Sequence, residues 1–118
     1  MLSAFRINLG VSAYNKKNYE SAKNYFELAK DTDNQDNLLI IFIYEQKIIL
    51  DTKGKKSALE VEQALLQNED KILSSTLSGL NDSYYGLLLR TKTFGEQKIE
   101  QQIIKDLYEK IDKPGAKD

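Results

Sequence analysis

The sequence predicts an all-α domain built from antiparallel helix-turn-helix hairpins, and three observations support this fold class. The only proline, Pro114, lies close to the end of the chain, which leaves the body of the sequence free to form helices. Strict alternation of apolar and polar residues never lasts for the length of a strand. Apolar residues instead recur every three or four positions in segments that are separated by short polar turns, as in amphipathic helices.

Size and composition are those of one globular domain. The chain has 118 residues, of which 41% are hydrophobic and 30% are charged. A chain of this length can bury a hydrophobic core, and this hydrophobic fraction is too high for a disordered protein. We expect a single helical domain over residues 1–112, followed by a flexible tail over residues 113–118.

The first two predicted helices form a hairpin. The first helix runs from about Leu2 to Asn15 and carries two neighbouring apolar stripes, which are Phe5, Leu9 and Ala13, and Ile7, Val11 and Tyr14. A tight turn follows at residues 16–18, where the side chain of Asn18 is suited to cap the next helix. The second helix is expected from about Tyr19 to Asp31, with Ala22, Tyr25, Phe26 and Ala29 on one face.

The third predicted helix is central because it is apolar on most of its faces. It follows a polar loop at residues 31–36, in which Asn34 or Asp36 can act as the cap, and it runs from about Asn37 to Asp51. The apolar run 38–44 would also suit a buried strand, but the pattern continues to Leu50, beyond the length of a strand. A fourth helix begins near Lys55 and carries a stripe of Ala58, Val61, Ala64 and Leu65.

Residues 66–82 leave two alternatives open, and a clear capping signal follows them. Either Asn68 caps a separate fifth helix over residues 69–78, or one long helix covers residues 55–78. Gly79 then breaks the helix, and a sixth helix is expected from Ser83 to about Lys92. Thr93 and Glu96 match a capping box, which predicts that an amphipathic last helix begins at Phe94 and runs to about Asp112, with an apolar stripe of Ile99, Ile103, Leu107 and Ile111.

Segment 3–36 has the spacing of a repeat unit. It contains Leu9-Gly10, Tyr14, Tyr19, Ala22, Phe26 and Ala29 in a helix-turn-helix unit of about 34 residues. In these residues the chain resembles tetratricopeptide repeat (TPR) proteins. A second unit matches at Ser57, Val61, Ala64 and Leu65, and a third, about 69–92, has Gly86 as the small residue where its helices would cross. The first unit departs from the family pattern at Arg6 and Ala13, and no proline closes it.

This resemblance implies a fold and a binding surface. It implies about three TPR-like helical pairs, with the segment 94–112 as a C-terminal capping helix. In such arrays the first helix of each pair lines a concave groove, which would place Tyr14 and Tyr44 on the groove surface. Family members that clamp a C-terminal carboxylate carry Lys and Asn where this chain has Ile7 and Val11, so a more apolar groove is expected here.

Several classes of function are disfavoured by what the sequence lacks. There is no Cys and no His, so a thiolate nucleophile, a cysteine zinc site and the usual general base are absent. The net charge of -1 gives no basic excess for binding nucleic acid. The longest apolar run, residues 38–44, is far shorter than the roughly 20 residues that span a bilayer. We therefore expect no enzymatic activity, no cofactor or metal, no nucleic-acid partner and no direct membrane insertion.

The sequence predicts a non-catalytic adaptor in protein–protein interaction. An aromatic ring flanked by amides suits the capture of a peptide segment or an amphipathic helix from a protein partner. The expected contact residues are Asn8, Val11, Tyr14, Asn15, Tyr44 and Lys47. One open alternative is that Tyr14 only packs against the next hairpin. Another is that the apolar stripe of the last helix makes the chain a structural homo-oligomerisation module, for example a homodimer.

The compartment is left unassigned. The chain begins inside its first predicted helix, which is typical of a domain cut from a longer protein. A cytoplasmic location is the default, and a periplasmic or membrane-associated one would follow if the chain were a fragment of an exported protein.

Overall fold

In the computed structural model, residues 2–77 and 79–94 are described, and every regular element among them is a helix. The elements in chain order are α1 (Leu2–Asn15), α2 (Tyr19–Ala29), α3 (Gln35–Lys53), the short 3₁₀ helix η1 (Gly54–Ser57), α4 (Ala58–Gln67), α5 (Glu69–Leu73) and α6 (Leu80–Phe94). This confirms the all-α class for the described part of the chain. Within that part, no helix is long and apolar enough to cross a membrane.

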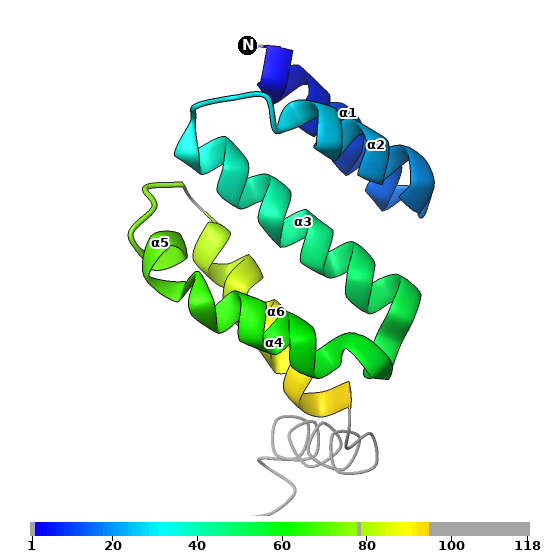
Figure 1. Cartoon of the computed structure of the whole chain (residues 1–118), viewed down its shortest axis with the longest axis vertical. Coiled ribbons are helices and arrows are strands. Elements are labelled where there is room, and N and C mark those ends of the chain that lie inside the picture. The colour runs from blue at the N-terminus through cyan, green and yellow to red at the C-terminus, as the bar shows by residue number, and fades with distance from the viewer. Residues whose placement is uncertain (1, 78, 95–118) are drawn as a thin grey trace, which may run out of the picture.

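The long helix α3 lies between two groups of helices, as Figure 1 shows. The hairpin of α1 and α2 packs on one side of α3, and α4, α5 and α6 pack on the other. Helix α3 contacts both α1 and α6, which come from opposite ends of the described chain. The central position that the apolar third helix predicts is therefore confirmed.

Caps and turns set the helix ends close to their expected positions. The Asn18 side chain accepts a hydrogen bond from the backbone N–H of Ser21 at 3.4 Å, and Asn34 does the same for Asn37 at 3.0 Å. Because Asn34 rather than Asp36 is the cap, α3 begins at Gln35, two residues earlier than expected. Helix α3 ends where Gly54 adopts a φ of +60°, a backbone conformation that glycine tolerates best.

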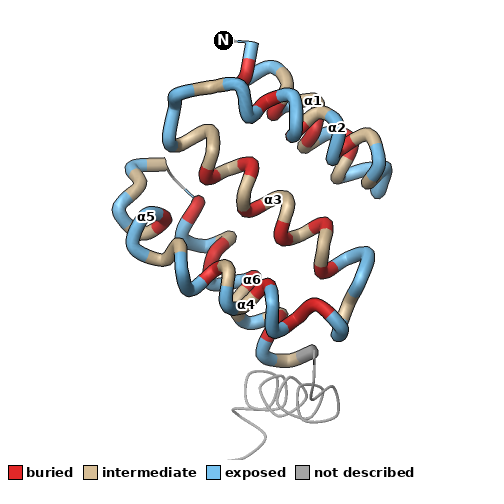
Figure 2. The backbone as a smooth tube through the Cα atoms, viewed as in Figure 1, coloured by how far each residue is buried: buried red, intermediate tan, exposed pale blue. Residues whose placement is uncertain are grey.

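Two hydrophobic clusters form the core, one on each side of α3 (Figure 2). The first cluster joins α1 and α2 to α3 through Ile7, Ala13, Ala22, Phe26, Ala29, Ile41 and Ile48. The second joins α3 to the remaining helices through Leu39, Ile43, Leu50, Ala58, Val61, Leu65, Ile72, Leu80, Tyr84 and Leu87. Since α3 contributes to both clusters, it must be apolar on opposite faces, as its sequence is.

The crossing of α1 and α2 depends on the absence of a side chain at Gly10. A Cβ atom built there would lie 2.6 Å from Cε1 of Phe26, and the Phe26 side chain is fully buried. Gly10 is therefore the small residue at which α1 and α2 cross closely. The parallel expectation for Gly86 is wrong, because Gly86 is exposed and a Cβ built there meets nothing within 4 Å.

The segment between α4 and α6 differs from both alternatives. A separate helix does start at Glu69, but α5 ends at Leu73, and Asn68 donates its side-chain amide to the carbonyl of Ala64 at 2.8 Å instead of capping α5. The next helix, α6, begins at Leu80, directly after Gly79 with its φ of +85°. Its start is therefore three residues earlier than the predicted Ser83.

The expected capping box at Thr93 is also wrong. Helix α6 continues through Phe94, so Thr93 lies within a helix and does not begin one. Its hydroxyl donates to the carbonyl oxygen of Leu89 at 2.9 Å, a common use of threonine inside a helix. Glu96, the rest of the predicted last helix and the tail 113–118 lie outside the described residues.

Candidate functional site

Four aromatic rings connect α1, α2 and α3. The rings of Tyr14 and Tyr44 meet edge to face, with centroids 5.4 Å apart, and Tyr14 makes a similar contact with Tyr19 at 5.9 Å. Tyr44 in turn stacks on Phe26, with centroids 5.5 Å apart. Phe26 is fully buried, whereas the three tyrosines are half-buried. The cluster therefore runs from the core to the surface.

The Asp51 carboxylate ties this cluster to α6. Its Oδ2 accepts hydrogen bonds from the hydroxyls of Tyr14 at 2.8 Å and Tyr19 at 3.2 Å. Its Oδ1 accepts from the guanidinium of Arg90 at 2.7 Å, an ion pair between α3 and α6. One carboxylate at the end of α3 thus holds side chains from α1, α2 and α6.

These contacts shift the pKa values of both partners. Burial alone would raise the pKa of Asp51, but the hydrogen bonds from Arg90 and Tyr14 and the charge of Arg90 outweigh burial, so the pKa lies below its ordinary value. Burial, and then the hydrogen bond to Asp51, raise the pKa of Tyr14 to about 12. At neutral pH the carboxylate is therefore ionised, the phenol is neutral, and the hydrogen bond between them is maintained.

Lys47 lies over the ring of Tyr44. Its Nζ is 4.5 Å from the centroid of the Tyr44 ring, which is within cation–π range. Burial, and then the nearby charge of Arg90, lower the pKa of Lys47. Lys47 makes no ion pair with any residue that the structure describes. It is a half-buried cation, and Asp51, the carboxylate one helical turn further on the same face of α3, is already bound to other groups.

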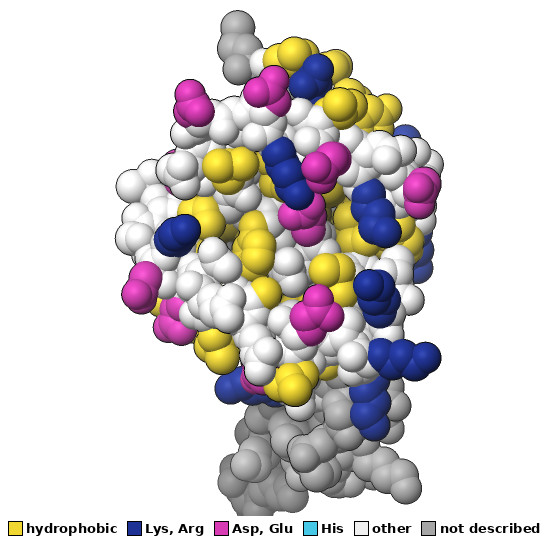
Figure 3. Space-filling model, viewed as in Figure 1, with side chains coloured by type: hydrophobic (Ala, Val, Ile, Leu, Met, Phe, Trp, Pro, Cys, Tyr) yellow, Lys and Arg dark blue, Asp and Glu magenta, His cyan; other side chains and the backbone are white. Residues whose placement is uncertain are grey.

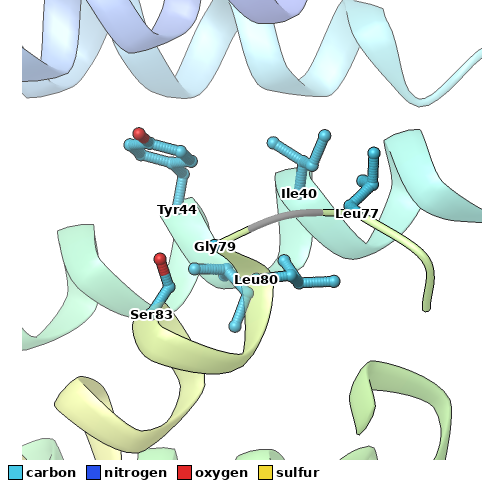
Figure 4. A pocket seen from close by; sticks show the side chains of 7 residues that line it. Ile40, Tyr44, Leu77, Gly79, Leu80 and Ser83 are labelled. Carbon is cyan, nitrogen blue, oxygen red and sulfur yellow. The ribbon is translucent and has the colours of Figure 1, made fainter. Parts of the chain in front are cut away.

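A pocket of about 300 Å³ opens beside Tyr44 (Figure 4). Its walls come from α3, from the end of the loop before α6 and from the first turn of α6, and they are formed by Ile40, Ile43, Tyr44, Leu77, Gly79, Leu80 and Ser83. The loop is fixed by a hydrogen bond of 2.9 Å from the hydroxyl of Ser75 to the carboxylate of Asp36. The lining is mainly aliphatic, with hydroxyl groups on Tyr44 and Ser83. We call Tyr14, Tyr44, Lys47 and this pocket the Tyr44 surface.

The structure brings together three of the six predicted contact residues, which are Tyr14, Tyr44 and Lys47. Val11 is half-buried and packs against the first core cluster. Asn8 and Asn15 are exposed on α1, and neither makes a side-chain hydrogen bond to another described residue. Tyr14 does pack against the next helix, as the open alternative supposed, but it remains half-buried.

Sequence reasoning missed Asp51 and Arg90. Asp51 lies four residues after Lys47 and seven after Tyr44, a spacing that puts all three on one face of α3. This periodicity is the signal that could have identified Asp51. Arg90 had no such signal, because its contact with Asp51 joins residues 39 positions apart.

Neither a metal centre nor a known family accounts for this site. Within residues 2–77 and 79–94, no group of three or more Asp, Glu, His or Cys side chains could hold a metal ion. Comparison with protein-family models, with curated proteins and with solved structures finds no match to this chain. A function must therefore be inferred from the chain's own geometry.

Proposed function

We propose that this domain is a non-catalytic adaptor that binds a segment of a protein partner at the Tyr44 surface, within a TPR-like array of helical pairs. The observation that carries the proposal is the combination at Tyr44 of a half-buried aromatic ring, a largely aliphatic pocket and a half-buried cation, Lys47, that makes no ion pair with the described part of the chain. Aromatic anchors beside apolar pockets are typical of energetically important contacts in protein interfaces.

The helix contacts are consistent with this arrangement. Helix α3 contacts α1 and α6, so these helices could supply the first members of successive pairs, with α2 and α4 as second members. The Tyr44 surface takes its groups from α1, α3 and α6 and from the loop before α6. A partner segment bound there would cross more than one pair, as expected of a groove ligand in a repeat array.

A pocket-filling variant tests the proposal without removing core side chains. Ser83→Phe should occupy the pocket, whereas Asn81→Phe places the same ring at an exposed position of the same helical turn that does not line the pocket. Each immobilised variant is exposed to a lysate of cells that express the protein, and folding is checked by circular dichroism. We expect a protein that is retained by wild type and Asn81→Phe and is lost with Ser83→Phe. Equal capture by all three folded chains would refute the proposed site.

The alternative function is structural homo-oligomerisation, and it has one favourable observation. Tyr85 and Leu89, four residues apart on α6, are 55% and 64% exposed. Large apolar side chains on one helix face can be buried by a second copy. On the face shown in Figure 3, hydrophobic side chains are scattered among charged ones of both signs, an arrangement that suits solvent better than a large apolar interface.

A further inference from the structure

Building on the proposed function, we infer that the segment bound at the Tyr44 surface carries a large aliphatic side chain for the pocket and, close to it, an aspartate or glutamate side chain that pairs with Lys47. The two features that call for these side chains meet at Tyr44, which both lines the pocket and lies under the Lys47 ammonium group.

The pocket selects for an aliphatic group. Ile40, Ile43 and Leu80 provide apolar walls, and the pocket volume is about 300 Å³. Burial of a Leu, Ile or Met side chain there would remove apolar surface from water and so stabilise a complex. A charged side chain in the same place would lose hydration without gaining an ion pair from the pocket walls, so the pocket disfavours it.

Lys47 favours a carboxylate because its ammonium group makes no ion pair within residues 2–77 and 79–94. On the neighbouring part of the fold, Lys30 pairs with Glu45 at 2.8 Å and with Glu27 at 3.1 Å. Asp51, one helical turn after Lys47 on the same face of α3, already accepts hydrogen bonds from Tyr14, Tyr19 and Arg90. A partner carboxylate would therefore meet a half-buried cation that has no competing ion pair in the described part of the chain.

The spacing between the two features limits the spacing in the ligand. With a rise of 1.5 Å per residue, Lys47 lies roughly 5 Å along α3 from Tyr44 and roughly 10 Å from Ile40. An extended peptide covers about 3.3 Å per residue, so its aliphatic and acidic side chains should be about two or three residues apart. In a helical ligand, which rises 1.5 Å per residue, a reach of about 5 to 10 Å corresponds to positions about three to seven residues apart.

The backbone around Lys47 favours an acidic side chain over a free C-terminal carboxylate. Sites for a chain terminus generally use several unsatisfied backbone N–H groups as donors. Lys47 lies in the interior of α3, which spans Gln35–Lys53, where backbone N–H groups are already bonded within the helix. A single ammonium group is a sufficient partner for one side-chain carboxylate.

Selection from a library of random twelve-residue segments tests the inference. Each segment is displayed with both ends joined to a carrier, so that no free C-terminus is present. The baits are wild type, Ser83→Phe, Lys47→Met and Lys53→Met. Methionine keeps an apolar stem while removing the charge, and Lys53 is an exposed lysine of the same helix, which makes it the matched control. Circular dichroism confirms that each bait is folded.

We expect wild type and Lys53→Met to enrich segments that pair a large aliphatic residue with Asp or Glu. Lys47→Met should keep the aliphatic preference and lose the acidic one. For one selected peptide, amidated at its C-terminus, Lys47→Met and replacement of its acidic residue by the matching amide should each raise Kd about five- to tenfold, as for a partly desolvated ion pair.

The unfavourable outcomes separate the two proposals. Segments enriched without acidic residues, or with an acidic preference that survives in Lys47→Met, would overturn the inference and leave the adaptor function standing. Enrichment that is unchanged by Ser83→Phe would mean that the pocket is not the binding site, and this would refute both proposals. No enrichment on folded wild type would contradict both as well.

Discussion

The contact between Gly10 and Phe26 allows a quantitative prediction about how α1 and α2 pack. In Gly10→Ala the new Cβ would lie 2.6 Å from Cε1 and 2.8 Å from Cδ1 and Cζ of Phe26, whereas unstrained carbon contacts are about 3.5 to 4.0 Å. The Phe26 ring is fully buried and stacks on Tyr44, so it cannot move away without disturbing a second ring.

The magnitude follows from two opposing effects. Overpacking a core by one methyl group costs about 1 to 3 kcal/mol, and contacts this short on three ring atoms favour the upper end. Alanine gains up to about 1 kcal/mol over glycine in a helix. Gly10→Ala should therefore lower the free energy of unfolding by about 2 kcal/mol. Gly86→Ala, where nothing lies within 4 Å of the new Cβ, should raise it by about 0.5 to 1 kcal/mol.

Urea denaturation followed by circular dichroism at neutral pH measures both variants. A third protein, Gly10→Ala with Phe26→Leu, should be less impaired than the sum of its two single changes, because the smaller side chain removes the collision. If Gly10→Ala were as stable as Gly86→Ala, or if the two changes were additive, the close crossing of α1 and α2 at Phe26 would be refuted.

Three further predictions concern polar contacts and assembly. Asp51→Asn should lower the free energy of unfolding by about 1 to 2 kcal/mol, while Asp33→Asn in the exposed loop should change it little. Because folding lowers the pKa of Asp51, its ionised carboxylate contributes to stability above about pH 4, and this contribution is lost as the pH falls through the folded-state pKa. Urea titrations should therefore show that the difference in free energy of unfolding between wild type and Asp51→Asn disappears only in acid. Burial, and then the 3.0 Å hydrogen bond to Glu69, raise the pKa of Tyr84 from 10.0 to about 12. The neutral Tyr84 hydroxyl therefore contributes fully to stability below pH 10, and this contribution is lost as the pH rises through 12. Over this interval the free energy of unfolding should fall more steeply for wild type than for Tyr84→Phe. Light scattering at high protein concentration should give the monomer mass of 13.5 kDa, and twice that mass would support the homo-oligomerisation alternative.

Local signals in the sequence were sufficient for much of the fold. The cap at Asn18 and the turn before it set the start of α2 at Tyr19, as expected. The apolar character of α3 on opposite faces predicted its position between two clusters. Both signals act over a few residues or along one helix, which is why they can be recognised in the sequence.

Features that depend on tertiary contacts were harder to predict. Gly10 and Gly86 look alike in the sequence, but only Gly10 faces a buried ring. Thr93 matches a cap, yet α6 continues past it, since a threonine inside a helix can donate its hydroxyl to a carbonyl of the preceding turn. Local chemistry at such positions permits more than one structure, and packing between distant segments decides among them.

The candidate site also combines features that the sequence predicts with features that depend on tertiary contacts. Helical spacing on α1 and α3 was enough to select Tyr14, Tyr44 and Lys47, which the structure places side by side. The Asp51–Arg90 ion pair and the pocket between α3 and α6 involve segments about 40 residues apart. Their formation depends on the course of residues 54–79, where the sequence left two alternatives open.

The most direct test of the central claim is to map where a ligand binds. The tightest peptide from the library selection is added stepwise to the ¹⁵N-labelled full chain, and amide chemical shifts are followed by NMR. A partner segment bound at the Tyr44 surface should cause the largest shifts at Ile40, Tyr44, Lys47, Leu80 and Ser83, in proportion to saturation. Largest shifts around the exposed Leu59 and Leu66 of α4, with little change near Tyr44, would contradict the account.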